Sequence, residues 1–321
     1  MPTGHLGFAV KVLGADLPSH DTRRWQSDPH LRVSLGYLDA ILDYLARHDV
    51  RLYRISSDLA PYLTHPDMPQ FHAQIEEAAG ELAAIGEKAR RHNVRLSFHP
   101  SQYILLNAAD EEIARKSARD LNAQAAMLDA MGMGPECVVV THVGGTYGDK
   151  EASIQRFIER YRVLEGPACA RLVIENDDKS YGIADCARIH AATGVPIVFD
   201  YLHYRNYNPG DVPLDEAITV ALGSWRAGVR PKMHFSSPRT ELREVSRKNA
   251  ETGKKETVLQ PPLNSQHSDY VNPFEFIDFA RALPADSSVD IMLEAKAKDL
   301  ALLRLRADLA KYAPDVAARF R

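Results

Sequence analysis

The sequence predicts an α/β fold, a closed (β/α)₈ TIM barrel formed by a single domain that spans residues 1–321. Short, nearly continuous apolar runs recur eight times, and longer segments with helical spacing separate them. Such alternation is typical of a parallel sheet covered by helices, and eight units in one chain favour closure into a barrel. No glycine-rich dinucleotide fingerprint follows the first run, which disfavours a Rossmann fold.

The apolar runs and the segments between them define the expected elements. We predict strands at residues 6–11, 50–56, 94–99, 137–142, 171–176, 196–201, 232–236 and 290–295. The helical pattern is clearest at residues 31–45 and in the Ala- and Leu-rich residues 118–131. Residues 238–263 are polar and rich in Arg and Lys, and we predict a large loop there, on the barrel face where active sites lie.

The overall composition is that of an ordinary water-soluble globular protein. Hydrophobic residues make up 45% and charged residues 26% of the 321 positions, which is enough for a large core. Cys137, Cys169 and Cys186 form no CxxC pair, so neither a disulfide framework nor a cysteine-rich zinc site is expected. We find no signal peptide and no run of roughly 18 apolar residues, and we expect a cytoplasmic protein without a membrane partner.

Polar side chains recur at the ends of the predicted strands. Seven of them are of metal-binding types: His99, His142, Glu175, Asp200, His203, His234 and Glu294. One such residue alone is most often structural, but all strand ends of a barrel converge on one rim. Carboxylates and imidazoles crowded at one rim are costly through desolvation and like-charge repulsion, and divalent metal ions relieve that cost. We therefore predict a metal centre at this rim.

The types and number of the ligands indicate the metal and the chemistry. Histidine and carboxylate ligands without thiolate suit Zn²⁺, Mn²⁺ or Fe²⁺. Seven or eight ligands exceed what one ion requires, so we expect two or three ions with Glu175 as a bridging carboxylate. Such a cluster favours phosphoester hydrolysis. Bound cations also reverse the local charge, so the formal net charge of −4 does not exclude DNA as a partner.

Seven sequence blocks resemble, in order, signature blocks of the UV damage endonucleases, a family related in fold and metal site to endonuclease IV. The blocks are residues 54–66, 96–107, 141–150, 173–182, 232–239, 267–271 and 292–299. Any one block is a weak signal, but the ordered set is highly specific. The resemblance covers roughly residues 5–310 of the chain.

The resemblance implies a DNA repair enzyme that binds damaged double-stranded DNA. It implies a nick immediately 5′ to cyclobutane pyrimidine dimers, 6-4 photoproducts and some abasic sites, which leaves a 3′-hydroxyl and a 5′-phosphate. The usual metal is Mn²⁺, with Zn²⁺ or Co²⁺ as substitutes. Carried over residue by residue, the ligands are His99, His142, Glu175, Asp200, His203, His234, His267 and Glu294. We expect a monomer that acts at the nucleoid without an obligate protein partner.

The resemblance assigns roles to three further residues. Gln102 and Tyr103 match a pair that the family inserts into the duplex from the minor groove when the lesion is flipped out; an aromatic ring can replace lost stacking there. Without the resemblance, the two residues indicate only a turn with a partly buried Tyr. Lys232 stands two residues before His234 and shares its face of the strand, which points it into the barrel.

In the family this lysine can be carboxylated. The alternative for Lys232 is an ammonium group that pairs with a carboxylate or with a substrate phosphate. We assign Lys232 to the catalytic group, together with Glu175 and His234.

The first strand departs from the family pattern. The family usually has Tyr after the glycine and Asn a few residues later, whereas this chain has Gly7, Phe8, Lys11 and Val12. Lesion contacts by Phe8 and Lys11 are therefore expected to differ from those of the family. We also expect Arg239, at the start of the predicted loop, to contact DNA.

Two other functions fit part of the sequence. A sugar isomerase or epimerase of the same barrel superfamily would use the carboxylates and His234, but it would leave His99, His142, His203 and His267 without a task. A non-catalytic damage sensor would bind distorted DNA through the basic residues of the predicted loop. These residues are Arg239, Arg243, Arg247, Lys248, Lys254 and Lys255. Each of them taken alone is most simply a solvated surface residue.

Overall fold

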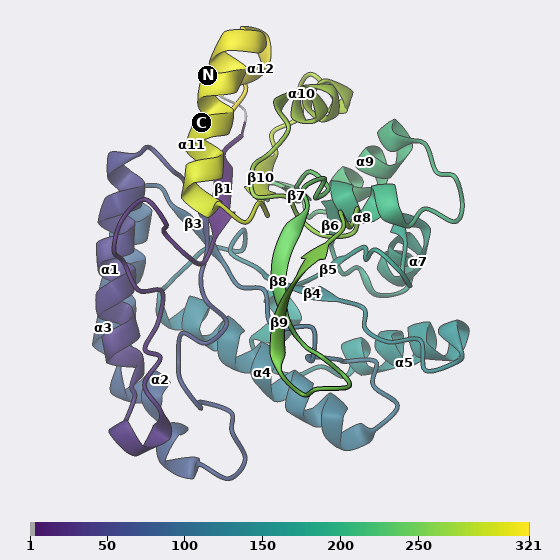
Figure 1. The fold of residues 1–321 in the computed structure, drawn as a ribbon. Coiled ribbons are helices and arrows are strands. Elements are labelled where there is room, and N and C mark those ends of the chain that lie inside the picture. Colours follow the sequence, from purple (N-terminus) through teal and green to yellow (C-terminus); the bar gives the residue numbers. More distant parts are fainter. Residues whose placement is uncertain (1–3, 321) are drawn as a thin grey trace.

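Eight parallel strands form the centre of the molecule, and helices cover them on the outside (Figure 1). The structure is a computed structural model that describes residues 4–320. The strands of the barrel are β1 (Leu6–Ala9), β2 (Leu52–Arg54), β3 (Arg95–Ser97), β4 (Val139–His142), β5 (Leu172–Glu175), β6 (Ile197–Asp200), β7 (Lys232–Phe235) and β10 (Asp290–Leu293). Each lies within a segment predicted as a strand from the sequence.

The strands close into a barrel, as predicted. Their order is β3-β2-β1-β10-β7-β6-β5-β4, and every pairing is parallel. A parallel bridge between Phe98 and Val139 joins β3 to β4 at the two ends of this order. There the Phe98 amide donates to the Val138 carbonyl at 3.0 Å, and the Val140 amide donates to the Phe98 carbonyl at 3.0 Å. Closure leaves no unpaired edge and brings the carboxyl ends of all strands to one rim.

A long helix follows each strand of the barrel. These helices are α1 (Leu31–Arg47), α3 (Ala79–Arg91), α4 (Glu111–Ala130), α5 (Lys150–Arg162), α7 (Ile183–Thr193), α9 (Leu214–Gly223), α10 (Pro273–Ala282) and α11 (Lys298–Tyr312). The shorter turns of helix are η1 (Trp25–Ser27), η2 (Pro69–Phe71), α2 (Gln74–Glu77), α6 (Ala168–Arg171), α8 (Tyr201–Asn206) and α12 (Pro314–Ala317). In the part of the chain that the structure describes, no helix has the length and apolar character needed to cross a bilayer.

Side-chain caps explain where several helices begin. The side chains of Asp110, Asp149 and Asn272 each accept a hydrogen bond from a backbone amide in the first turn of α4, α5 and α10. Pro273 follows the Asn272 cap at the first helical position, where its missing N–H costs nothing. The two segments with the clearest helical pattern accordingly became α1 and α4, although α4 begins seven residues earlier than the predicted residue 118.

The barrel interior changes in chemistry along its axis. Because successive strand residues point to opposite faces, alternate side chains enter the barrel and the others pack under the helices. Val138, Val140, Val173 and Val198 form one interior cluster with Trp225, and a second cluster contains Ala9, Leu52 and Met292. The polar side chains of the functional site lie above these apolar residues, toward the carboxyl ends of the strands.

Residues 238–263 form more structure than the predicted loop. They contain an antiparallel hairpin of β8 (Arg243–Lys248) and β9 (Lys255–Gln260), which lies in front of the barrel strands in Figure 1. The turn is held by Asn249, whose backbone N–H donates to the Lys254 carbonyl at 2.8 Å, and Gly253 has a φ of 68°. The hairpin is largely exposed and buries no apolar face, so its sequence lacks the alternation that marks a strand.

Candidate functional site

All eight predicted metal ligands meet at the carboxyl-terminal rim of the barrel. His142, Glu175 and Asp200 are the last residues of β4, β5 and β6, His234 lies in β7, and Glu294 directly follows β10. His99, His203 and His267 lie after β3, in α8 and before α10. Five consecutive strands of the closed barrel order, together with β3, therefore supply the cluster.

Glu175 is the centre of this cluster. Its carboxylate is fully buried and lies 2.9 Å from His99 Nε2 and 2.8 Å from His234 Nδ1. His142 Nε2 and His203 Nδ1 are further away, at 3.7 and 3.5 Å. Four imidazoles thus surround one carboxylate, an arrangement in which a bridging ligand is expected.

Glu294 and Asp200 extend the cluster to either side. Glu294 Oε1 lies 3.4 Å from His234 Nδ1, and Glu294 Oε2 lies 3.6 Å from His267 Nε2. Asp200 caps α8 and accepts a hydrogen bond from the His203 amide at 2.8 Å. The capping interaction fixes the Asp200 carboxylate relative to the His203 ring, whose Nδ1 is 3.8 Å from it.

The donor atoms gather into two groups that could each hold an ion. One group contains His99, Glu175, His234 and Glu294, and the other contains Glu175, Asp200 and His203. Asp200 Oδ2 is buried and has no hydrogen-bond partner in residues 4–320, as expected of an oxygen reserved for a cation. The side chains present therefore fit divalent metal ions, with Glu175 common to both groups.

The electrostatics of the cluster reflect burial and mutual attraction. Burial opposes the charged form of Glu175, but His234 and His142 outweigh it and hold the pKa of Glu175 well below its usual value. Burial raises the pKa of Asp200 to about 7 and lowers that of His234 to about 4. Burial alone would lower the pKa of His203, but Asp200 and Glu175 raise it to about 9. A neutral His234 is in the form that binds a metal.

Two supporting residues were missed from the sequence. Arg54, at the end of β2, pairs with Glu294 and lies 3.1 Å from His234 Nε2. Asn176 holds Asp200 through both ends of its amide: Oδ1 accepts from the Asp200 N–H at 2.9 Å and Nδ2 donates to the Asp200 carbonyl at 3.0 Å. Arg54 could have been found as another polar strand end, whereas nothing in the sequence indicates the bonds of Asn176.

Lys232 lies inside the barrel, as its position relative to His234 predicted. It is fully buried, and its Nζ donates to Ser97 Oγ at 2.9 Å. Burial and the nearby Arg54 and Arg95 lower its pKa well below the usual value. An uncharged amine is the form that reacts with carbon dioxide, so the environment suits the carboxylation that remains a prediction.

Three of the predicted lesion contacts lie on the surface of the protein. Gln102, Tyr103 and Lys11 are exposed near the carboxyl ends of β3 and β1, and Tyr103 keeps 74% of its surface accessible. Among the large apolar side chains of the described residues, that of Tyr103 has the largest exposed fraction. Their contacts with DNA remain predictions.

Phe8 and Arg239 do not fit the expectation of DNA contacts. Phe8 alternates with the inward-facing Gly7 and Ala9, so its ring lies under the helices, 5.5 Å from the ring of Tyr53, with no exposed surface. Arg239 is fully buried at the base of the hairpin, where Nη2 donates to the Pro261 carbonyl at 3.1 Å. Neither side chain reaches solvent, and Arg239 supports the hairpin from beneath.

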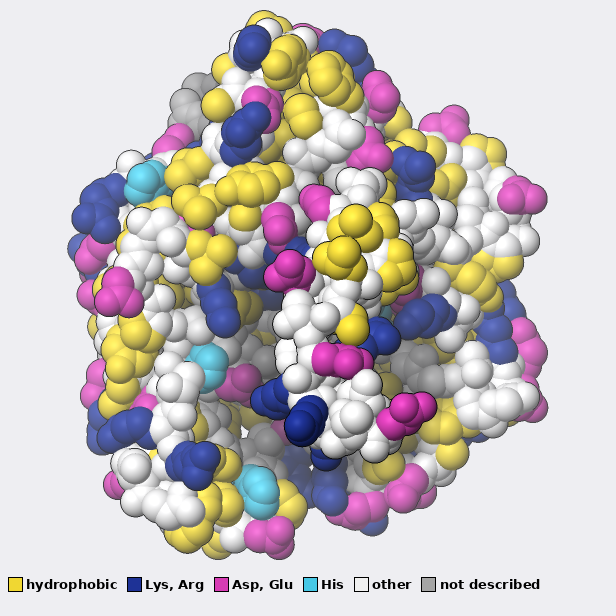
Figure 2. All heavy atoms as spheres, in the orientation of Figure 1, with side chains coloured by type: hydrophobic (Ala, Val, Ile, Leu, Met, Phe, Trp, Pro, Cys, Tyr) yellow, Lys and Arg dark blue, Asp and Glu magenta, His cyan; other side chains and the backbone are white. Residues whose placement is uncertain are grey.

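The hairpin carries the basic residues of this face. Lys248, Lys254, Lys255 and Arg247 are exposed near its turn, while Arg243 pairs with Asp269. Figure 2 shows Lys and Arg side chains gathered at this end of the hairpin, beside a hollow in the surface. An exposed, basic ribbon beside the rim is suited to contact phosphates.

The family model described as UV-endonuclease UvdE matches residues 34–317. The chain belongs to this family. Its relatives include two proteins named UV DNA damage endonuclease: one from Bacillus velezensis is 34% identical over 84% of this chain and 78% of its own length. Another from Bacillus cereus is 32% identical over 87% of this chain and 82% of its own.

Solved structures agree with membership of the UvdE family. The crystal structure of SacUVDE is 30% identical, with a TM-score of 0.79 over 96% of this chain and 98% of that chain. A D-psicose 3-epimerase has a TM-score of 0.54 at 11% identity, over 98% of this chain and 99% of that chain. The likeness to the epimerase shows the shared barrel fold alone.

Proposed function

We propose that this UvdE-family endonuclease cuts the phosphodiester backbone of UV-damaged duplex DNA immediately 5′ to the photoproduct, leaving a 3′-hydroxyl and a 5′-phosphate. Its substrates are cyclobutane pyrimidine dimers, 6-4 photoproducts and some abasic sites. The observation that carries the proposal is Glu175, buried among four imidazoles and shared by two groups of donor atoms. This arrangement supports hydrolysis by two or three divalent ions.

The proposed ligands are the eight rim residues, and the proposed ion is Mn²⁺, with Zn²⁺ or Co²⁺ as substitutes. When bound, such ions supply Lewis acidity and lower the pKa of water. Glu175 is the proposed bridging ligand because both groups of donors include it. His234 orients the Glu175 carboxylate at 2.8 Å, and Asn176 fixes Asp200 by two hydrogen bonds. Such supporting contacts keep the ligands oriented before the substrate arrives.

The DNA is held by cationic groups around the rim. Lys11, exposed after the carboxyl end of β1, and the basic end of the hairpin that follows β7 can contact backbone phosphates. Contacts of this kind release counterions, so DNA affinity should fall steeply as salt rises. Lys232 acts within the barrel, either as an amine or as its carbamate, and adjusts the charge beneath His234.

The lesion is recognised by displacement from the helical stack. Tyr103, which is 74% exposed, enters the duplex and stacks in the space that the flipped nucleotides leave. The adjacent Gln102 then donates and accepts hydrogen bonds with the unpaired bases opposite the lesion. The exposure of both side chains supports this role, because neither is engaged in the folded core.

The test is an end-labelled duplex with one cyclobutane dimer, incubated with purified protein and Mn²⁺ beside an undamaged duplex and resolved on a denaturing gel. We expect one metal-dependent nick just 5′ to the dimer. Religation by a DNA ligase identifies the 3′-hydroxyl and 5′-phosphate ends. A chelator in excess should abolish the nick, and adding back each metal in turn ranks Mn²⁺, Zn²⁺ and Co²⁺.

Other results, on this gel or in parallel binding and sugar-isomerisation assays, contradict the proposal in distinct ways. Equal cutting of damaged and undamaged duplex would contradict recognition of the lesion. Lesion-specific binding without a nick in the presence of Mn²⁺ would indicate the damage sensor. Isomerisation of a sugar, with no nick under the same conditions, would move the function to the epimerase branch of the barrel superfamily.

A further inference from the structure

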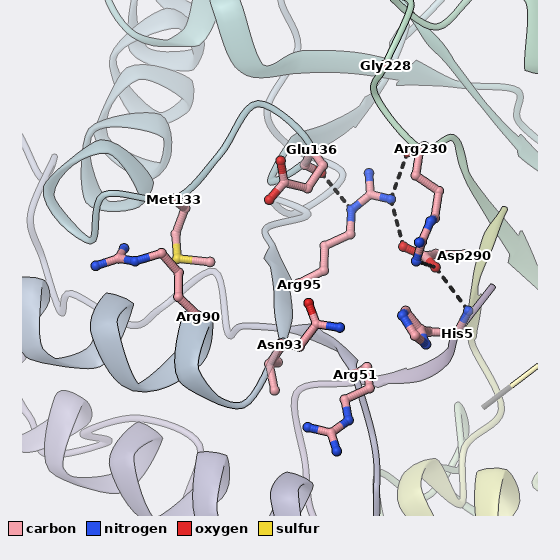
Figure 3. Close-up of a pocket in the computed structure, with 11 residues that line it drawn as sticks. His5, Arg51, Arg90, Asn93, Arg95, Met133, Glu136, Gly228, Arg230 and Asp290 are labelled. Carbon is pink, nitrogen blue, oxygen red and sulfur yellow. Dashed lines mark hydrogen bonds and ion pairs between the residues drawn. The ribbon is translucent and has the colours of Figure 1, made fainter. Parts of the chain in front are cut away.

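A second polar pocket lies at the opposite end of the barrel, where the strands begin. It has a volume of about 330 Å³, near the lower limit of small-molecule sites, which span roughly 300–1,000 Å³. Figure 3 shows its side chains around the open space, contributed by the starts of β1, β2, β3 and β10 and by neighbouring loops. Its charged and titratable lining includes His5, Arg51, Arg90, Arg95, Arg230 and Asp290.

The charges around this pocket are not balanced. Four arginines line it against two carboxylates, those of Glu136 and Asp290, and a third carboxylate, that of Asp49, pairs with Arg51 at 2.6 Å. Arg95 and Arg230 share the single carboxylate of Asp290, at 3.0 and 3.2 Å. Arg90 has no carboxylate partner among residues 4–320 and donates only to the carbonyls of Met131 and Gly132, at 2.8 and 2.7 Å. The pocket therefore carries an excess of positive charge.

Two buried nitrogen atoms in its wall are also unused. Nη2 of Arg95 and Nδ1 of His5 are buried and have no hydrogen-bond partner in the described chain, although the Arg95 guanidinium lies over the Trp225 ring, 5.5 Å from its centroid. Arg95 itself is only 6% exposed and its other nitrogens are fully engaged, with the Glu136 carbonyl at 2.7 Å and Asp290. Buried donors without partners are rare in native proteins, and a bound anion is one way to satisfy them.

We propose that this pocket binds a small phosphate-bearing anion, either inorganic phosphate or the phosphate group of a nucleotide. Guanidinium groups donate in parallel pairs that match the oxygens of a phosphate, and the pocket has guanidiniums on opposite sides, from Arg90 and Arg230. A multivalent anion also matches the excess of positive charge better than a monocarboxylate does. The site is separate from the metal centre, because its residues lie at the other end of the strands.

The arginines of the pocket come from segments that are far apart in the sequence. Arg90 lies in the last turn of α3, Arg51 precedes β2 and Arg230 precedes β7, so an anion in the pocket would contact more than one connecting segment. A ligand that binds only the folded state stabilises it in proportion to the logarithm of its concentration. We expect phosphate at about 100 times its Kd to raise the Tm by roughly 5 °C.

The test is calorimetric titration of the metal-loaded protein with inorganic phosphate and, separately, with ADP, together with Tm measurements. The variants are Arg230→Gln and the double variant Arg90→Gln/Arg230→Gln. The matched control is Arg226→Gln, an exposed arginine four residues before Arg230 that does not line this pocket. Glu175→Gln separates phosphate bound at the metal centre, because that signal depends on Glu175 and not on Arg230.

The proposal expects a phosphate-binding component that weakens at least tenfold in Arg230→Gln, disappears in the double variant, and persists in Arg226→Gln and Glu175→Gln. Equal affinity for phosphate and ADP identifies free phosphate as the ligand, and at least tenfold tighter binding of ADP identifies a nucleotide. Wild-type nicking of UV-damaged DNA by the Arg230→Gln protein verifies that it is folded. Unchanged phosphate binding and Tm response in the folded double variant would overturn the proposal.

Discussion

The two ends of this barrel use charged residues in opposite ways. At the carboxyl-terminal rim, Glu175 and Asp200 are buried among histidines, and the side chain of Glu294 is 11% exposed beside two of them; within residues 4–320, Arg54 is the permanent cation that pairs with one of these carboxylates. At the amino-terminal end, the buried Asp290 is paired with Arg95 and Arg230, and cations are in excess. The first end is built to hold cations that the chain does not supply, whereas the second pairs its buried carboxylate with the chain's own arginines and retains an excess of positive charge.

The charges at the rim serve chemistry, whereas those at the amino-terminal end serve the fold. A buried carboxylate that lacks a permanent partner costs stability, and a protein keeps it where a ligand compensates. A buried ion pair closed by hydrogen bonds costs little while intact but much when one partner is removed. Substitutions at the two ends should therefore separate activity from stability.

The largest effect is expected from Glu175→Gln at the rim. Loss of the shared carboxylate should reduce nicking of dimer-containing DNA by on the order of 10³-fold or more, because metal ions contribute several kcal/mol to such reactions. The free energy of unfolding should fall only modestly: burial opposes the charge of Glu175, but its interactions with His234 and His142 outweigh burial, keep its pKa low and are lost in the variant. Single-turnover gels and urea denaturation measure the two quantities. The control is Glu151→Gln, an exposed partner of Arg188 that should change neither.

Asp290→Ala, at the amino-terminal end, should lower the free energy of unfolding and leave nicking largely intact. It leaves the buried Arg95 without its carboxylate, which should lower the free energy of unfolding by about 3–5 kcal/mol. Folded protein at low temperature should still cut at close to the wild-type rate. Asp315→Ala, which breaks the exposed pair with Arg281, is the control and should cost less than about 1 kcal/mol. A large loss of nicking by folded Asp290→Ala protein would contradict the assignment of this end of the barrel to stability alone.

Asn176→Ala should weaken the metal site without removing a ligand. Asp200 loses two hydrogen bonds that orient it, so metal affinity should fall by about 10- to 100-fold while activity returns at high Mn²⁺. Metal titrations followed by calorimetry and by nicking measure this shift. The control is Asn206→Ala in α8, whose amide contacts only the backbone carbonyls of Leu202 and Asn264. A loss of activity that excess metal does not restore would indicate a role beyond positioning.

Tyr103→Ala should reduce the preference for damaged DNA by about tenfold, because stacking on one aromatic ring contributes roughly 1–3 kcal/mol. Stability should not change, since the side chain is 74% exposed. Competition between damaged and undamaged duplexes measures the preference. Tyr103→Phe keeps the ring and should behave like the wild type; equal losses in both variants would point to the hydroxyl instead.

The smallest change, in the free energy of unfolding, is expected at Lys232, which lies inside the barrel between its two ends. Replacement by Met keeps the volume and removes a buried amine, so the free energy of unfolding should rise by about 1 kcal/mol. If the carbamate forms, bicarbonate should stimulate nicking by the wild type and not by Lys232→Met. Stimulation of both proteins, or of neither, would argue against carboxylation.

Much of the fold and site could be predicted from local patterns. Eight apolar runs separated by helical segments dictate a barrel, and a barrel brings every strand end to one rim, which is why Glu175, Asp200 and His234 could be grouped without a structure. The period-2 rule also placed Lys232 inside. The same rule, applied to β1, would have placed Phe8 on the helix-covered face of the barrel, where the structure has it fully buried.

The sequence by itself therefore determined the order of strands and helices and the ends at which polar residues fall. Only the tertiary structure decided which of these residues meet: Arg54 reaches Glu294 across 240 positions, and Arg95 reaches Asp290 across 195. It also turned the basic residues 243–260 into a hairpin and buried Arg239 beneath it. Local periodicity reports which face of its own element a residue occupies, whereas pairs and pockets depend on which elements become neighbours when the barrel closes.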